Sequence, residues 1–261
     1  MRPALWLSLF LTLSLPRMHA HAQASAIGTT RSFVGCAIYR DTDLGRKSGC
    51  WLVDDPADGS RFDVSFAPNK PREGQAVWVE GVVTADPDLC GGTVLKAVRV
   101  SVLPAPCPVV RVPPEGHKGR PSPPPVDVLP PTRVPRTLPP PPYEPRTFTI
   151  YFEHGRDFLI YQHAEVVLEK AQLYAQASGA RSVAITGFAA TEPLVISGHT
   201  LAEDLVLAEA RAAMAAEALR RLGVPPALLR ISVAGAPAPT DLENGKLPES
   251  SKRRVTITVT P

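Results

Sequence analysis

The sequence of 261 residues lacks the short motifs that mark enzymes and metal sites. It has no H-E-x-x-H helix, no G-x-S-x-G elbow, no Walker A loop and no glycine-rich dinucleotide fingerprint. Aromatic residues make up only 6% of the chain, and no two cysteines have the C-x₂₋₄-C spacing of a zinc site. We therefore expect a protein that is not an enzyme and needs no cofactor or metal.

A basic surface for nucleic acid is also missing, although the whole chain has a net charge of +3. Residues 25–107 carry nine Lys and Arg against ten Asp and Glu, and residues 147–261 carry eleven against twelve, so each range sums to −1. The excess of positive charge lies in residues 108–146, with six against three, and in Arg2 and Arg17. Neither of the two larger ranges has the charge of a nucleic-acid-binding domain, so no nucleic-acid partner is expected.

Only one long hydrophobic run is present, from Ala4 to Leu15. It follows Arg2 and precedes small residues that allow cleavage after Ala22 or Ala24, which is the pattern of a secretory signal peptide. An uncleaved anchor is the alternative. We expect residues 1–24 to be a signal and the protein to be exported to the periplasm or cell envelope. No later segment has transmembrane length, so no transmembrane segment is expected in the mature chain.

The four cysteines all fall within residues 25–107, which predicts two disulfides in a small exported domain. Three pairings are possible. Cys36 and Cys50 lie symmetrically about Asp43-Leu44-Gly45, as cross-strand partners in a hairpin would. This symmetry favours Cys36–Cys50 together with Cys90–Cys107.

Prolines divide the chain, because seventeen of the thirty lie between Pro104 and Pro145. Each proline removes a backbone donor and fixes φ, so a packed domain does not tolerate that density. We predict a proline-rich linker over residues 108–146 between two small domains, 25–107 and 147–261. A stiff spacer is the default interpretation of the linker, and a PxxP-type ligand for an aromatic groove is the alternative.

The N-terminal range is rich in strand patterns and contains no helical pattern of ten residues. Five apolar or alternating segments are separated by Gly, Pro and Asp clusters. The segments are 33–39, 50–53, 61–66, 76–83 and 93–103. This spacing predicts a small all-β barrel. The segment Glu73 to Gly81, a turn leading into a strand that ends in Gly, loosely resembles OB-type barrels, whose ligands are oligonucleotides or oligosaccharides.

The C-terminal range predicts the order β-α-β-α-β-β, an α+β fold with helices packed on a mixed sheet. Strands are expected at 147–152, 182–186, 229–234 and 254–260, with a first helix from Leu159 to Ser178. The second helix, Leu201 to Leu222, has the most regular pattern in the chain. Its apolar positions follow a 4-3-4-3-4-3 spacing along one face. They are Leu201, Leu205, Ala208, Ala212, Ala215, Leu219 and Leu222.

Four short motifs in residues 147–261 resemble, in order, those of the OmpA-like family of peptidoglycan-associating domains. Tyr151-Phe152-Glu153 is similar to the first-strand Y-F-D, and Ile185-Thr186-Gly187 to the opening of I-T-G-H-T-D. The helical segment 207–212 is similar to L-S-x-x-R-A, and Lys252-Arg253-Arg254-Val255 to N-R-R-V. The resemblance implies a mixed sheet with helices on it and a ligand in the peptidoglycan stem peptide.

In that family an Asp at the end of the T-G-H-T-D loop pairs with the diaminopimelate amine, and the helix Arg binds its carboxylate. Here Arg211 is present, but Ala190 stands at the Asp position, Phe188 replaces the His, and the loop is longer. The residues that we predict to line the site are Arg211, Thr186, Gly187, Glu192 and Asp204.

Two interpretations of this domain remain. In the first, it still associates with peptidoglycan, weakly or with altered specificity. In the second, it is an adapter that contacts other envelope proteins and no longer binds diaminopimelate. A surface pair between Arg211 and Asp204 or Glu192 would carry no function at all.

Overall fold

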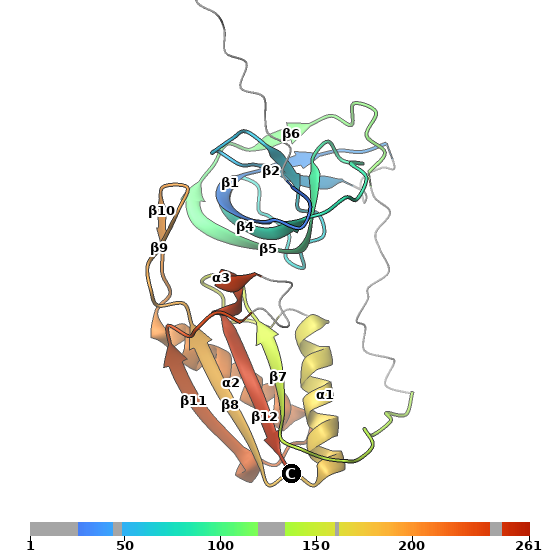
Figure 1. Cartoon of the computed structure of the whole chain (residues 1–261), viewed down its shortest axis with the longest axis vertical. Coiled ribbons are helices and arrows are strands. Elements are labelled where there is room, and N and C mark those ends of the chain that lie inside the picture. The colour runs from blue at the N-terminus through green and yellow to red at the C-terminus, as the bar shows by residue number, and fades with distance from the viewer. Residues whose placement is uncertain (1–25, 44–48, 120–133, 160–161, 241–246) are drawn as a thin grey trace, which may run out of the picture.

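The computed structural model describes residues 26–43, 49–119, 134–159, 162–240 and 247–261. It has an N-terminal β domain above a C-terminal α+β domain (Figure 1). The predicted signal, residues 1–24, lies outside the described residues. Within the described part of the chain, no helix is long and apolar enough to cross a membrane.

The N-terminal domain is a mixed sheet of six strands that closes on itself. Its strands are β1 Thr30–Arg40, β2 Cys50–Asp54, β3 Arg61–Asp63, β4 Gln75–Val83, β5 Thr93–Pro106 and β6 Val110–Val112. The pairing order is β2-β3-β5-β4-β1-β6, and β1 also pairs with β2, which completes the ring. Apolar residues from all five ring strands fill the interior, among them Phe33, Val53, Phe62, Val79 and Leu95. Each of the five segments expected from the sequence overlaps one of the first five strands.

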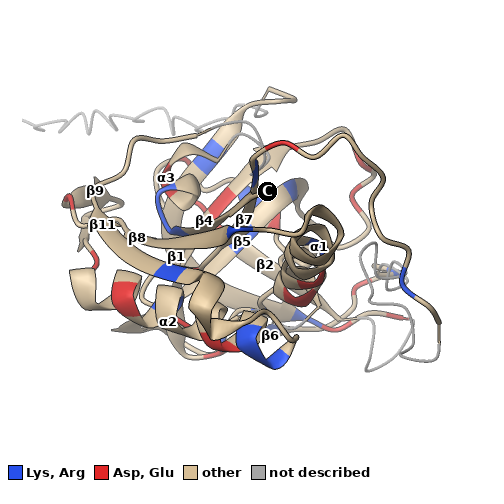
Figure 2. Cartoon of the chain, turned by 90° about the horizontal axis from the view of Figure 1, so that it is seen from below, with Lys and Arg blue, Asp and Glu red and all other residues tan. Residues whose placement is uncertain are grey.

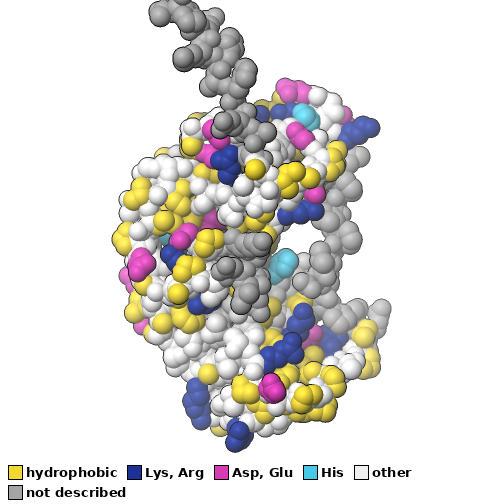
Figure 3. Space-filling view, in the orientation of Figure 1, with side chains coloured by type: hydrophobic (Ala, Val, Ile, Leu, Met, Phe, Trp, Pro, Cys, Tyr) yellow, Lys and Arg dark blue, Asp and Glu magenta, His cyan; other side chains and the backbone are white. Residues whose placement is uncertain are grey.

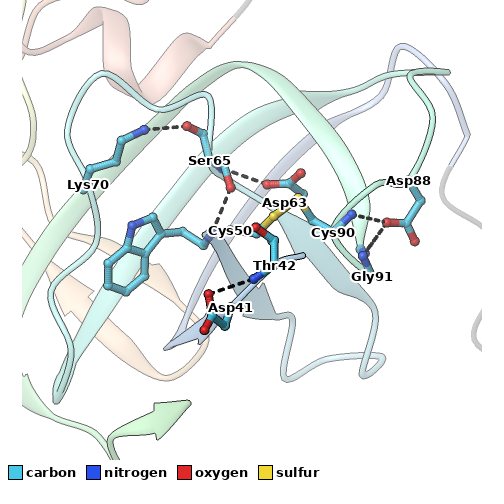
Figure 4. The surroundings of a disulfide bond; sticks show 11 residues. Asp41, Thr42, Cys50, Asp63, Ser65, Lys70, Asp88, Cys90 and Gly91 are labelled. Atoms are coloured by element: carbon cyan, nitrogen blue, oxygen red, sulfur yellow. Dashed lines mark hydrogen bonds between the residues drawn. A yellow bond between two sulfur atoms is a disulfide. The ribbon is translucent and has the colours of Figure 1, made fainter. Parts of the chain in front are cut away.

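The disulfides join Cys36 to Cys107 and Cys50 to Cys90, so the pairing favoured by the sequence is wrong. The reason is the hairpin register. Strands β1 and β2 align Cys50 with Arg40, four residues after Cys36, and Cys36 lies opposite Ala76 of β4 instead. Figure 4 shows the Cys50–Cys90 bridge beside Asp88, whose carboxylate accepts hydrogen bonds from the backbone N–H groups of Cys90 and Gly91.

Both ends of the predicted linker pack on the domains. Strand β6, within residues 108–146, pairs in parallel with the end of β1. At the other end, Arg136 donates to Glu169 over 2.6 Å, and the Tyr143 ring contacts that of Tyr174 edge-on. Residues 120–133, which hold six of the linker's prolines, lie outside the described residues, so the domain boundaries and the PxxP interpretation stay predictions.

The C-terminal domain is a four-stranded mixed sheet with two helices on one face (Figure 2). Its elements are β7 Arg146–Tyr151, α1 His163–Ser178, β8 Ser182–Ala189, β9 Leu194–Ile196, β10 His199–Leu201, α2 Leu205–Arg221, a 3₁₀ turn Pro226–Leu228, β11 Leu229–Gly235, α3 Pro248–Ser251 and β12 Arg254–Thr260. The strand order is β11-β8-β12-β7, and β9 and β10 form a separate hairpin. The sequence predicted the order of the principal elements and missed this hairpin.

Helix α2 packs on the sheet through the residues that its periodicity identified. Ala208, Ala212, Ala215 and Leu219 are fully buried. The N-terminal end of the predicted apolar pattern differs from expectation, because Leu201 belongs to β10 and the Leu205 side chain is 42% exposed. The small alanines bring the helix so close to β8 that a Cβ at Gly187 would lie 2.0 Å from the Ala208 carbonyl oxygen. Only glycine fits at this crossing.

Replacing Gly187 by Ala should therefore destabilise the C-terminal domain strongly. The clash is with helix backbone, so α2 must move away from the sheet, and overpacking of this kind costs about 1–3 kcal/mol or more. Gly235→Ala is the matched control, because its Cβ would meet the Thr191 side chain at 3.1 Å, and that side chain is able to rotate. Urea unfolding of both variants measures the effect. An equal cost for the two would contradict the backbone contact.

Candidate functional site

Arg211 lies on the buried face of α2 and has no exposed surface. Its Nε donates to the Arg156 carbonyl over 2.8 Å, and Nη1 donates to the Phe188 carbonyl over 2.9 Å. Nη2 donates to the Glu153 carbonyl over 3.3 Å. The remaining two hydrogen bonds go to a carboxylate. A guanidinium has five N–H donors, so Arg211 has none left for a ligand.

That carboxylate belongs to Glu203, just before α2. Its two oxygens lie 2.6 and 2.8 Å from Nη2 and Nη1 of Arg211, a bidentate pair in which both side chains are fully buried. The same oxygens accept hydrogen bonds from the backbone N–H groups of Gly155 and Ala190. Burial opposes ionisation, but Arg211 and the Ala190 N–H outweigh it and lower the pKa of Glu203. Glu203 is therefore a carboxylate at neutral pH.

The N-terminal domain covers this end of the C-terminal domain. Glu80 of β4 accepts a hydrogen bond from Arg253, and both side chains are buried. Burial raises the pKa of Glu80, against the opposing effect of the Arg253 charge. The Arg253 guanidinium also lies 4.4 Å above the Trp78 ring. These contacts place a buried ion pair at the centre of the interface.

Two further contacts join the domains beside Glu203. Arg99 of β5 lies 3.3 Å from the Glu153 carboxylate, and the backbone N–H of His154 donates to Ser101. The His154 ring contacts Trp78 edge-on, with its Nδ1 3.9 Å from Glu203. Burial lowers the pKa of His154, so the ring is neutral at neutral pH. The loop after β7, which holds Arg211 through carbonyl groups, is thus also bound to the N-terminal domain.

The long loop before α2 forms the β9–β10 hairpin, which extends from the lower domain along the upper one (Figure 1). Leu201, Leu194 and Ile196 pack with Val34 and Trp78 in one apolar cluster. The Ser197 hydroxyl accepts a hydrogen bond from the backbone N–H of Val34 over 3.1 Å. In the space-filling view, hydrophobic side chains gather along the left margin around this hairpin (Figure 3). The hairpin therefore holds the two domains together.

The other predicted site residues do not gather around Arg211. Thr186 lies on the sheet face away from α2, where its hydroxyl bonds to Ser232 over 2.9 Å. Gly187 lies at the close contact between β8 and α2. Asp204 is exposed and caps α2 by accepting a hydrogen bond from the Val206 N–H. Glu192 is exposed and makes no side-chain hydrogen bond to another described residue.

The sequence reasoning missed Glu203. It directly precedes the capping residue Asp204 and so lies outside α2, and no helical periodicity links it to Arg211. The sequence offers one hint. Arg211 matches the arginine of the OmpA-like motif, but the Asp of that motif is missing, so a buried Arg211 needs another carboxylate as its partner. Among the described residues, no group of three or more His, Cys, Asp or Glu is placed to hold a metal ion.

Comparison with known proteins gave structural similarities only. No family model and no curated protein matches the chain. Solved OmpA-like domains match it in structure. The OmpA-like domain of FopA1 from Francisella tularensis is 18% identical, covers 43% of this chain and 70% of its own, and has a TM-score of 0.34.

Two further solved structures match similarly. The peptidoglycan-associated lipoprotein from Burkholderia pseudomallei is 21% identical, over 43% of this chain and 90% of its own, with a TM-score of 0.34. The periplasmic domain of Helicobacter pylori MotB is 23% identical, over 45% of this chain and 74% of its own, also with a TM-score of 0.34. These matches include the family that the sequence motifs resemble.

Glu203→Gln should destabilise the protein by about 3–5 kcal/mol at pH 7, because it leaves the buried Arg211 charge unpaired. The pKa of Glu203 is lowered from 4.5 in the folded protein, so its carboxylate stabilises the fold above pH 4.5. That stabilisation is lost as the pH falls through the lower, folded pKa. The difference between variant and wild type should therefore shrink in acid, which urea unfolding at pH 7, 5 and 3 measures.

Asp204→Asn is the control for this pH series. It changes the neighbouring carboxylate to an equally good helix cap at an exposed position, so it should cost little at any pH. A Glu203→Gln penalty that stays constant down to pH 3 would show that the charge of Glu203 does not stabilise the fold.

Proposed function

We propose that this chain is a non-catalytic cell-envelope protein whose C-terminal domain is an OmpA-like scaffold with a closed peptidoglycan site. The observation that carries this proposal is the bidentate Glu203–Arg211 pair, in which the protein's own carboxylate occupies the arginine that a ligand carboxylate would need. Of the two interpretations that the sequence allows, this pair favours the adapter, which contacts other envelope proteins, over the wall anchor.

A diaminopimelate carboxylate would have to displace Glu203 to reach Arg211. The displaced carboxylate would lose four hydrogen bonds, two from Arg211 and one each from Gly155 and Ala190. The ligand would find no acidic side chain at position 190 for its amine, and the N-terminal domain would have to move away first. Each of these steps opposes binding, because buried polar groups that lose partners are costly.

The interface holds the two domains in one arrangement. With ion pairs, an apolar cluster and the hairpin joining them, the two domains present one continuous outer surface to a partner. The two disulfides fit an extracytoplasmic location, and we place the protein in the periplasm or cell envelope.

We also propose that the N-terminal domain is an OB-type barrel. The support is its closed ring of five short strands, in the order β1-β2-β3-β5-β4. The outer surface of β1, β4 and β5 packs on the C-terminal domain through Val34, Trp78 and Leu103. A ligand on that part of the barrel would compete with the C-terminal domain.

Co-sedimentation of the purified full chain with peptidoglycan sacculi tests the closed site. The wild type should stay in the supernatant, while the peptidoglycan-associated lipoprotein from Burkholderia pseudomallei serves as the positive control. Ala190→Asp, which restores the family's acidic residue, should give no gain, because Arg211 stays occupied. A wild type that sediments with the sacculi would overturn the proposal and support the wall-anchor function.

A further inference from the structure

Strand β11 forms one edge of the C-terminal sheet and, among the described strands, pairs with β8 alone (Figure 1). It is seven residues long and is exposed at most positions. The side chains of Ile231 and Val233 are 56% and 38% exposed. Exposed edge strands with apolar side chains invite pairing with another strand, and natural proteins usually block them with lysine, proline or a bulge. No lysine, proline or bulge occurs between Leu229 and Gly235, and the one charged residue there, Arg230, donates to the Ala227 and Leu229 carbonyls.

The backbone groups that face the open edge follow from the parallel pairing with β8. The N–H of Ala236 donates to the Ala189 carbonyl, continuing the register that ends with Gly235 opposite Ala189. Hydrogen-bonding direction alternates along a strand. Arg230, Ser232 and Ala234 therefore bond toward β8. Ile231, Val233 and Gly235 direct both their N–H and C=O groups outward. Leu229 differs, because its N–H donates to the Pro226 carbonyl and its C=O accepts a hydrogen bond from the Arg230 side chain.

We propose that β11 pairs with β11 of a second copy of this chain, antiparallel and about a two-fold axis at Ser232. This register places Ile231 opposite Val233 of the second copy and Leu229 opposite its Gly235. Ile231 and Val233 both carry outward-facing backbone groups, so each of the two Ile231–Val233 pairs exchanges two hydrogen bonds. Ser232 lies on the axis as a non-hydrogen-bonded pair, as its bonds toward β8 require. The backbone geometry and the two-fold symmetry are thus mutually consistent.

Side-chain chemistry matches the same register. Ile231 and Val233 meet on one face, so the two most exposed apolar side chains of the strand cover each other. On the other face Arg230 lies opposite Ala234 of the second copy, which avoids a like-charge contact between the two arginines. Leu205 lies beside Gly235, 3.5 Å from the position of a Cβ there, and it would contact Leu229 of the second copy. An edge with this pattern is self-complementary.

The pairing would join two four-stranded sheets into one of eight strands. On the face away from the helices, Ser232, Thr186, Thr256 and Thr149 lie in one row across the four strands. Since Ser232 is on the axis, the row would continue into the second copy without interruption. Glu203 and Arg211 make their hydrogen bonds to the loop after β7, to the end of β8 and to each other, and none to β11, so the dimer does not depend on the closed site.

Ser232→Cys tests the register directly. All four native cysteines are in disulfides, so the introduced thiol is the one that is free to oxidise. Opposed residues of a non-hydrogen-bonded pair have Cα atoms about 4.5 Å apart, within disulfide range. Mild oxidation should convert the variant to a covalent dimer on non-reducing gels. Arg230→Cys is the matched control, because its two copies would lie about 13 Å apart along the strands and should not cross-link.

Sedimentation velocity of the unmodified chain completes the test. The wild type should shift from one to two chain masses with rising concentration, and Ile231→Lys should remain at one mass. Val195→Lys, at a 70% exposed position on the hairpin, should dimerise like the wild type. A wild type that stays monomeric, or equal cross-linking at positions 230 and 232, would overturn the proposed pairing.

Discussion

The buried pair of Glu203 and Arg211 connects most of the features of the C-terminal domain. Arg211 binds the carbonyl groups of Glu153 and Arg156 in the loop after β7 and of Phe188 near the end of β8. Glu203 binds the N–H groups of Gly155 in the same loop and of Ala190, which follows β8. Two charged side chains therefore satisfy five backbone groups at the end of the sheet. Removing one member leaves the other charge unpaired in a site from which water is excluded.

The domain interface repeats this arrangement on a larger scale. Glu80 and Arg253 are buried in a contact between surfaces that would otherwise face water. A buried ion pair adds little net stability over apolar residues of the same size, because desolvation offsets the attraction. It does disfavour other docking geometries, since any shift leaves two buried charges without partners. Apolar contacts around Trp78 and Leu201 supply the association, and the ion pair selects one orientation of the domains.

The sequence allowed the order of the strands and helices to be predicted, because periodicity is a local property. Ala208, Ala212, Ala215 and Leu219 are buried as their spacing indicated. The disulfide pairing could not be predicted in this way, because it depends on the register between β1 and β2. That register differs from the one expected from the spacing of Cys36 and Cys50. Glu203 could not be predicted either. Its side chain reaches Arg211 through tertiary structure, whereas the helix-capping role of its neighbour Asp204 is readable from the sequence.

Three departures from the OmpA-like motif have one physical explanation in the structure. Ala190 donates its backbone N–H to Glu203, so an aspartate there would bring a second carboxylate close to the first. With Arg211 already paired, such a charge would have no cation to balance it. The longer loop forms the β9–β10 hairpin, which packs on the N-terminal domain above the same pair. The absence of an acid at position 190, the β9–β10 hairpin and the Glu203 carboxylate are therefore mutually dependent. Each is favourable only where Arg211 pairs with a carboxylate of its own chain.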